Sequence, residues 1–213
     1  MLTAALDAGL HALGQDDLSA TQRQALLDYL GLLSHWNRAY NLTAVREPEA
    51  MVSRHLLDSL SVRPFLCGQR ILDVGTGAGL PGIPLAVAEP SRQFILLDSL
   101  GKRMVFLRQV LLALKLDNVT LVQSRVQDYQ PTVKPDGVIS RAFANLGEFA
   151  TATRHLFHEH SCGLAMKGQG AGQELLAWQA TGGAADVSAE LLPLRVPGAQ
   201  EQRFLLRWRY VKN

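Results

Sequence analysis

A run of closely spaced glycines follows an acidic residue in the first half of the chain. The segment reads Asp73-Val74-Gly75-Thr76-Gly77-Ala78-Gly79-Leu80-Pro81-Gly82. Glycines let the backbone approach a ligand closely, and the start of a following helix offers free N–H groups to a polar or anionic group. The segment therefore predicts a binding loop for a nucleotide-like cofactor.

Two classes of cofactor enzyme use such a loop. Dinucleotide-binding enzymes need G-x-G-x-x-G, a spacing that Gly77, Gly79 and Gly82 satisfy. Enzymes that use S-adenosylmethionine place an acidic residue two positions before G-x-G-x-G, here Asp73 before Gly75, Gly77 and Gly79. We favour the second class because its glycines directly follow the expected strand. A turn without a ligand is disfavoured, because each glycine costs conformational entropy on folding.

Asp98 ends the next expected strand, 23 positions after Gly75. A carboxylate at that place can accept hydrogen bonds from both ribose hydroxyls of either cofactor. Its alternative role is to cap the helix that starts near Lys102, but Ser99 and Gly101 intervene. We therefore expect Asp98 to bind the ligand.

The elements that position these residues follow from hydrophobic periodicity. Apolar residues recur at helical spacing from Leu18 to Leu42 after a capping box at residues 19–22, and a second helical stretch starts at Glu47-Pro48 and ends near Val62. Beyond residue 63, expected strands alternate with expected helices. The strands are 70–74, 94–97, 119–122, 137–139, 163–166 and 203–211, and the helices are 84–88, 102–116, 146–157 and 173–179.

This alternation predicts an α/β fold with a doubly wound, mostly parallel, Rossmann-like sheet. In the last run, residues 204, 206, 208 and 210 form a dry face and residues 203, 205, 207 and 209 a wet one, which predicts a late antiparallel strand. We divide the chain into an N-terminal helical cap, residues 1–62, and a Rossmann-like domain, residues 63–213.

The composition is that of one folded domain with a small appendage, since 47% of the 213 residues are hydrophobic and 19% are charged. Residues 1–62 carry four basic and seven acidic side chains, whereas residues 63–213 carry 17 basic and 12 acidic ones. The surplus of 17 − 12 = +5 makes the second segment the better candidate for contact with a polyanion.

The two cysteines, Cys67 and Cys162, are far apart and neither belongs to a C-x-x-C pair. We therefore expect neither a disulfide nor a bound metal, and a reducing, cytoplasmic location. The N-terminus has no basic stretch followed by an apolar one, and no window approaches about 18 uninterrupted apolar residues. Secretion and membrane spanning are disfavoured, and we expect a monomer.

If the cofactor donates a methyl group, the acceptor binds at the ends of the later strands. The fourth strand ends in Ser140-Arg141-Ala142-Phe143, without the Asn-Pro-Pro-Tyr or Asp-Pro-Pro-Tyr that grips an exocyclic amine. No cysteine lies there to attack C6 of cytosine. The remaining acceptors own a free lone pair, as guanine N7 does, and need alignment rather than a general base.

Several segments resemble a known family, in order and in spacing, over about residues 20–170. They are 36–43, 54–59, 71–85, 96–103, 123–126 and 138–143. The family is the bacterial small-subunit ribosomal RNA methyltransferase G family, also called glucose-inhibited division protein B. The resemblance implies a class I methyltransferase fold and methyl transfer from S-adenosylmethionine to guanine N7, at position 527 in the 530 loop of 16S rRNA of the small ribosomal subunit.

Carried over residue by residue, the resemblance implies cofactor contacts at Gly75, Leu80, the pair Val126-Gln127 and Arg141. Gln127 stands where the family more often has Glu, which preserves a contact made through the backbone. The last 40 residues match only loosely, and we assign no site there.

Arg141 is the candidate catalytic residue, expected to orient the methionine carboxylate or the guanine without moving a proton; a surface salt bridge is its alternative role. Basic side chains could neutralise RNA phosphates and Tyr40 could stack on a splayed base. The RNA-binding candidates are Tyr40, Asn41, Lys102, Arg103 and Lys167. A merely solvated surface is the alternative for the basic ones. We expect His55 to be a hydrogen-bonded helix residue and Trp36 to lie in the core.

Two other functions stay open from the residues alone. An NAD-dependent oxidoreductase would use Gly77, Gly79 and Gly82 with Asp98. A non-catalytic ribosome-binding factor would keep the cofactor fold as a scaffold.

Overall fold

The computed structural model describes residues 1–141, 143 and 145–211, so Ala142 of the 138–143 segment lies outside the described residues. Its centre is a seven-stranded sheet in the order β3-β2-β1-β4-β5-β7-β6. The strands are β1 (Arg70–Val74), β2 (Gln93–Asp98), β3 (Val119–Gln123), β4 (Gly137–Ser140), β5 (Cys162–Lys167), β6 (Val187–Leu194) and β7 (Arg203–Tyr210).

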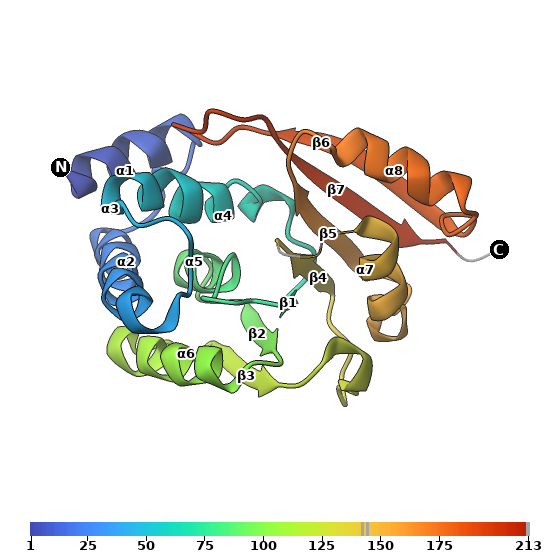
Figure 1. Ribbon diagram of the computed structural model, residues 1–213, viewed down its shortest axis with the longest axis horizontal. Coiled ribbons are helices and arrows are strands. Elements are labelled where there is room, and N and C mark those ends of the chain that lie inside the picture. Colours follow the sequence, from blue (N-terminus) through green and yellow to red (C-terminus); the bar gives the residue numbers. More distant parts are fainter. Residues whose placement is uncertain (142, 144, 212–213) are drawn as a thin grey trace.

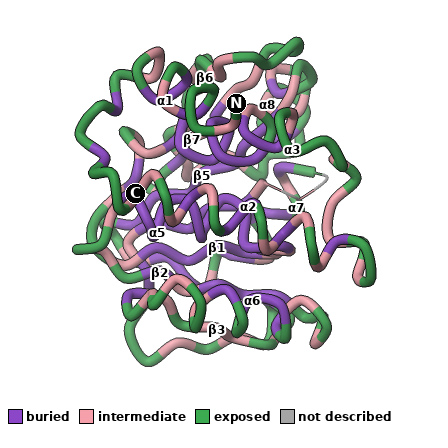
Figure 2. Tube along the Cα trace, turned by 90° about the vertical axis from the view of Figure 1, so that its left-hand side faces the viewer, coloured by how far each residue is buried: buried purple, intermediate pink, exposed green. Residues whose placement is uncertain are grey.

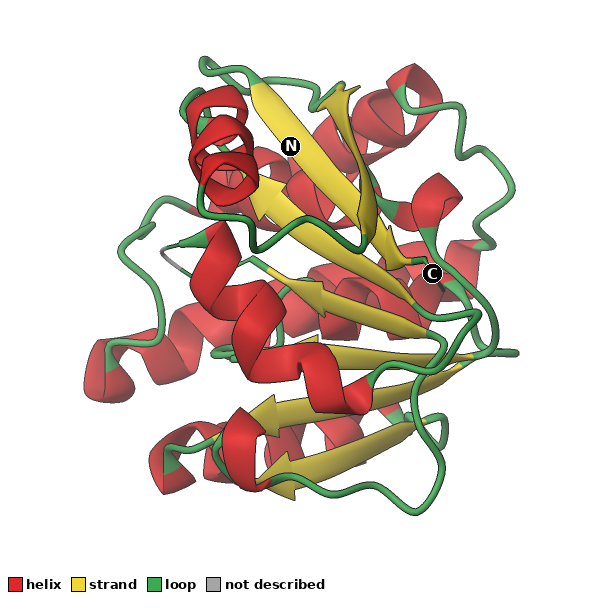
Figure 3. Ribbon diagram, turned by 90° about the vertical axis from the view of Figure 1, so that its right-hand side faces the viewer, coloured by secondary structure: helices red, strands yellow, loops and turns green. Residues whose placement is uncertain are grey.

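The first five strands are parallel, and β7 is antiparallel to both β5 and β6. The arrowheads in Figure 3 accordingly reach one edge of the sheet for the parallel strands and the opposite edge for β7. This confirms the predicted doubly wound, mostly parallel sheet with a late antiparallel strand.

Helical elements precede the sheet and connect its strands. Before the sheet lie α1 (Leu2–Ala12), α2 (Ala20–Tyr40), α3 (Pro48–Met51), the π-helical turn η1 (Val52–Leu57), α4 (Asp58–Leu60) and the 3-10 turn η2 (Arg63–Phe65). Between the strands lie α5 (Gly82–Ala88), α6 (Gly101–Leu114), η3 (Val126–Asp128), α7 (Leu146–Thr153), η4 (Arg154–Leu156) and α8 (Ala171–Ala180).

The long helix α2 begins and ends with recognisable caps. Ser19 Oγ accepts a hydrogen bond from the Gln22 amide, and the Gln22 side chain accepts one from the Ser19 amide, which is the predicted capping box. The helix ends at Asn41, whose left-handed backbone (φ 49°) stops further helical hydrogen bonding.

Two apolar layers lie on the two faces of the sheet. Successive residues of a strand contribute their side chains to one layer and then to the other. Ile71 belongs to the layer shared with α1, α2, α5 and α6, whereas Leu72 belongs to the layer shared with α7 and α8. Figure 1 shows these helix groups on opposite sides of the sheet, and Figure 2 shows the buried trace following the central strands. The first layer runs across residue 62, and the division there stays a prediction.

Three details of the secondary structure go beyond what the sequence predicted, two near the C-terminus and one at the N-terminus. β6 was not predicted, because its partly exposed, alternating residues include Pro193. Leu205, expected on a wet face of β7, is fully buried, since helices cover both faces of the sheet at that point. Helix α1 was not delimited by the sequence, although the first 62 residues were expected to be helical.

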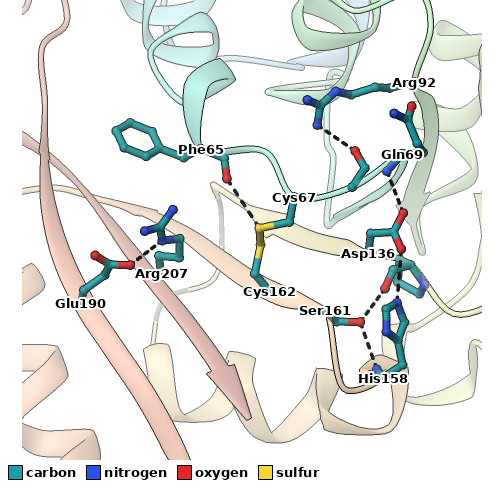
Figure 4. The surroundings of a disulfide bond; sticks show 12 residues. Phe65, Cys67, Gln69, Arg92, Asp136, His158, Ser161, Cys162, Glu190 and Arg207 are labelled. Atoms are coloured by element: carbon teal, nitrogen blue, oxygen red, sulfur yellow. Dashed lines mark hydrogen bonds and ion pairs between the residues drawn. A yellow bond between two sulfur atoms is a disulfide. The ribbon is translucent and has the colours of Figure 1, made fainter. Parts of the chain in front are cut away.

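The cysteines also differ from expectation, because Cys67 and Cys162 form a disulfide with Cα atoms 6.2 Å apart. Cys67 precedes β1 and Cys162 begins β5, so both lie at the amino edge of the parallel strands (Figure 4). Asp136 holds the same edge together, since Oδ2 accepts hydrogen bonds from the amides of Gln69 and Arg70. The two cysteines are 95 residues apart in the sequence, and the order of the strands in the sheet brings them together. Their spacing alone does not reveal this contact.

None of the helices in the described part of the chain combines the length and the apolar character that crossing a membrane requires.

The disulfide closes a long loop, and reducing it is expected to lower the free energy of unfolding by about 2 to 4 kcal/mol, because the reduced unfolded chain gains conformational entropy. Urea unfolding with and without dithiothreitol measures the difference. The variant Cys67→Ser/Cys162→Ser is the control and should not respond to the reductant. A wild-type curve that dithiothreitol leaves unchanged would show that the bond is not formed in solution.

Candidate active site

The candidate site lies where the connections of two adjacent strands diverge. β1 connects outward to β2 on one side, and β4, its neighbour on the other side, connects outward to β5. In open α/β sheets, ligands bind at the carboxyl ends of strands at such a switch point. The glycine-rich loop follows β1 at this place.

The loop has a backbone that only glycine adopts readily. The φ angles of Gly75, Gly77 and Gly79 are +68°, +61° and +92°. A Cβ on Gly79 would also lie 2.5 Å from Ile83 and 2.8 Å from Leu107. All three glycines of the G-x-G-x-G frame are therefore required by the conformation of the loop.

Gly82 has a different role. It begins α5, where a Cβ would lie 2.1 Å from Leu96, so its missing side chain lets the helix pack closely on β2. Its amide donates a hydrogen bond of 2.9 Å to Asp73 Oδ2, which also accepts one of 2.6 Å from Thr76 Oγ1. Burial raises the pKa of Asp73 to about 6, although these two hydrogen bonds oppose the shift. Asp73, on β1, is thus hydrogen-bonded to residues near both ends of the loop.

Asp98 faces the loop from the end of β2 and is 3% exposed. Its Oδ2 accepts hydrogen bonds from the Gly77 amide at 2.9 Å and from Arg103 Nη1 at 2.8 Å. Its Oδ1 accepts one from the Leu100 amide at 2.9 Å, at the start of α6. The carboxylate therefore combines the predicted position beside the loop with a local role at the helix start.

A cavity of about 200 Å³, the glycine-loop cavity, lies between these elements. Five residues singled out from the sequence line it: Gly75, Asp98, Arg103, Val126 and Gln127. Its other lining residues are Val74, Leu97, Ser99, Ser124, Arg125 and Phe143. Carboxylate, amide and apolar groups thus converge on one space, a combination that suits a nucleoside.

Other predicted cofactor residues lie outside that lining. Leu80 is buried in the core at 3% exposure, and Gly77 and Gly79 shape the loop from within. Arg141 lines a second cavity of about 330 Å³, together with Arg54, Asp58 and Arg203. The spacing of these last three residues gave no signal of a site, although Arg54 and Asp58 fall in a segment that carries the family resemblance.

The RNA-binding candidates differ in exposure and in partners. Asn41 and Lys102 are exposed. Tyr40 packs on the partly buried Trp36, with the two ring centroids 5.1 Å apart. Arg103 pairs with Asp98 inside the glycine-loop cavity. Lys167 is 7% exposed, and its Nζ donates to the Phe143 carbonyl and pairs with Glu174.

The cap contacts the loop directly. Tyr29 of α2 is fully buried, and its hydroxyl donates a hydrogen bond of 2.8 Å to the carbonyl of Ala78. Burial raises the pKa of this hydroxyl far above its ordinary value, so it stays a donor. The position of α2 is thereby linked to that of the glycine loop.

His55 is a buried member of η1, and its Nε2 lies 2.9 Å from Thr43 Oγ1, which confirms the predicted hydrogen-bonded helix residue. Its Nδ1 is buried and has no hydrogen-bond partner among the described residues. Burial, followed by the charge of Arg141, lowers the pKa of His55 to about 4. The imidazole is therefore neutral near pH 7.

This shift predicts a loss of stability in acid. The folded pKa of about 4 lies below the ordinary histidine value of 6.5, so below pH 6.5 the unfolded chain takes up a proton that the folded chain excludes. Stability should fall as the pH drops from about 6.5 to about 4. Compared with His55→Gln, the wild type should lose about 2 to 3 kcal/mol more between about pH 7 and about pH 4.5.

Urea unfolding at the two pH values measures this difference. The exposed His35→Gln is the matched control and should behave like the wild type. Equal losses in the wild type and in His55→Gln would contradict the assignment of a neutral, buried imidazole.

Solved structures resemble the fold. The O-methyltransferase TomG from Streptomyces achromogenes, in complex with SAM, aligns with a TM-score of 0.58 and 17% identity, covering 86% of this chain and 90% of that one. TYW2 from M. jannaschii, in complex with AdoMet, aligns with a TM-score of 0.56 and 13% identity, covering 75% and 78%. At these identities the likeness shows the fold alone, that of class I methyltransferases.

Sequence comparisons go further. A family model described as rRNA small subunit methyltransferase G matches residues 22–199. Ribosomal RNA small subunit methyltransferase G of Shewanella sp. (strain MR-4) is 49% identical over 207 residues, which covers 97% of this chain and 98% of the relative. The protein of that name from Pseudomonas syringae pv. tomato is 52% identical over 201 residues, covering 94% and 93%. The chain therefore belongs to the rRNA small subunit methyltransferase G family.

Proposed function

We propose that this protein transfers the methyl group of S-adenosylmethionine to N7 of a guanine in the 530 loop of 16S rRNA. As a member of its family, the chain is an S-adenosylmethionine-dependent rRNA methyltransferase. The observation that carries the proposal is the glycine-loop cavity, in which a left-handed G-x-G-x-G loop lies against the Asp98 carboxylate.

The residues present fit the cofactor. A carboxylate that accepts from two ribose hydroxyls is what a nucleoside needs, and Asp98 occupies the end of β2 beside the loop. Apolar side chains of Val74, Leu97 and Val126 line the same cavity and suit the faces of a purine. The hydrogen bonds from Gly77 and Arg103 hold the Asp98 carboxylate in one orientation before a ligand arrives.

The reaction requires little from the protein other than alignment of the methyl donor with the acceptor. When bound, the cofactor supplies a methyl group on a positively charged sulfur. The lone pair of guanine N7 attacks the methyl carbon as the carbon–sulfur bond breaks, and no proton has to leave. Holding donor and acceptor in line about 3 to 3.5 Å apart accounts for most of the expected acceleration. Arg141 serves binding and orientation in this proposal.

Family membership removes the basis for the NAD-dependent oxidoreductase. A non-catalytic ribosome-binding factor predicts RNA binding that Gly75→Arg leaves intact and no methyl transfer by the wild type. We also keep as proposals a cytoplasmic location, since bacterial ribosomes are made there, and a monomeric state.

The function is tested by transfer of labelled methyl from S-adenosylmethionine to small subunits from cells that lack this protein. Chemical cleavage at N7-methylguanine then maps the product. One stoichiometric cleavage in the 530 loop is expected. Absence of incorporation, or incorporation elsewhere in the rRNA, would overturn the proposal.

Asp98→Asn should weaken cofactor binding about tenfold or more, because ribose hydroxyls lose a charged acceptor. Titration calorimetry with S-adenosylhomocysteine measures the dissociation constant, and urea unfolding checks that the variant is folded. Asp117→Asn alters an exposed carboxylate near the start of β3 and serves as the control. Equal affinities in a folded Asp98→Asn and the control would remove Asp98 from the cofactor site.

A further inference from the structure

A second cavity, the arginine cavity, lies at the same edge of the sheet as the glycine loop and shares no lining residue with the glycine-loop cavity. It has a volume of about 330 Å³. Arg54 comes from η1, Arg141 follows β4, and Arg203 begins the antiparallel β7 beside the end of β5. Its other lining residues are Asp58, Val196, Ala199, Gln200 and Glu201.

The lining carries a net positive charge. Three guanidinium groups face two carboxylates, those of Asp58 and Glu201, so the sum is 3 − 2 = +1. Asp58 is 4% exposed, and its Oδ1 lies 2.8 Å from Arg203 Nε while its Oδ2 lies 3.6 Å from Arg141 Nη1. One buried carboxylate thus holds two arginines side by side.

Most donors of the three arginines have no partner within the described chain. Each guanidinium has five N–H groups. Contacts among the described residues use only Arg203 Nε and Nη2, toward Asp58, and Arg141 Nη1, toward the Arg54 carbonyl and Asp58. The Arg54 side chain is exposed and has no polar partner in that part of the protein. The cavity is therefore rich in donors that suit an oxyanion.

The walls of the arginine cavity are fastened to each other. Ser53 Oγ, on η1, donates a hydrogen bond of 2.7 Å to the Pro197 carbonyl. Gly198 next to it has a φ of +76°, and a Cβ there would lie 3.1 Å from Ser53 Oγ. The segment before β7 is thus held against the cap, which presents the arginines in a preformed arrangement.

We propose that the arginine cavity binds one phosphodiester group of the RNA substrate and so positions the RNA strand at the catalytic edge. This proposal rests on the proposed function. A phosphodiester carries a single negative charge, which matches the net +1 of the lining, and arginine binds phosphate through paired N–H donors. The methionine carboxylate of the cofactor has the same charge, and Arg141 is also an expected cofactor contact, so the test measures cofactor affinity beside RNA affinity.

Arg54→Ala tests the proposal, because removing this unpaired, exposed side chain breaks no ion pair. Arg46→Ala is the matched control, since Arg46 is an exposed arginine of the same N-terminal region and does not line the cavity. Filter binding to a 16S rRNA transcript, over a series of KCl concentrations, measures affinity and its salt dependence. Calorimetry with S-adenosylhomocysteine measures cofactor affinity.

We expect Arg54→Ala to bind the transcript about tenfold more weakly and to reduce the slope of log K against log [KCl] by about 0.7 to 0.9. Cofactor affinity should stay unchanged, and Arg46→Ala should match the wild type. Arg203→Lys keeps the charge but loses the paired donors, so it should bind more weakly at an unchanged slope.

Two results would overturn the proposal. If Arg54→Ala weakens the cofactor and leaves RNA binding intact, the cavity holds the methionine carboxylate instead. If Arg54→Ala and Arg46→Ala bind RNA equally well, the cavity is only solvated. Failure of the proposed function is distinguishable from failure of this proposal. The wild type would then show no methyl transfer, regardless of the RNA affinities of the variants.

Discussion

The left-handed backbone of Gly75, Gly77 and Gly79 is the constraint on which the candidate site depends. A loop of this shape cannot persist alone, because each glycine loses much conformational freedom when it is ordered. The protein secures the loop from two directions. Asp73 binds it from beneath with a buried carboxylate, and Tyr29 of the cap donates a hydrogen bond to it from the helix layer. Helix α2 is therefore one of the elements that hold the glycine loop in place.

The sequence was sufficient for most of the sheet because buried parallel strands are short, continuous apolar runs. The runs at 70–74 and 119–122 match β1 and β3 to within a residue. β6 was not predicted because the sequence of an edge strand with mixed exposure resembles that of a loop. Pro193 adds to this, because proline is unusual within a strand. The disulfide escaped for another reason. Its two cysteines meet only once the strand order is known, and no local pattern encodes that order.

The candidate site likewise contains residues that the sequence predicted and residues that it did not. Gly75 was found from the glycine spacing and Asp98 from its place at a strand end, whereas the pair Val126-Gln127 came from the family resemblance. The structure brings all four to one cavity. The arginine cavity was not found, because Arg54, Arg141 and Arg203 come from three elements far apart in sequence. Isolated arginines in a sequence look like solvated surface. Only the buried Asp58, which pairs with two of them, distinguishes this cluster from its surroundings.

The bond between Cys67 and Cys162 makes the middle of the chain a covalent ring. Every residue that lines the glycine-loop cavity lies inside this ring. The cap and the β6–β7 pair are arms outside it, and they supply Arg54 and Arg203 to the arginine cavity. Fraying of either arm dismantles the arginine cavity while the ring keeps the cofactor-lining segments tied together. A backbone cut between residues 68 and 161 would likewise leave both fragments joined as one molecule.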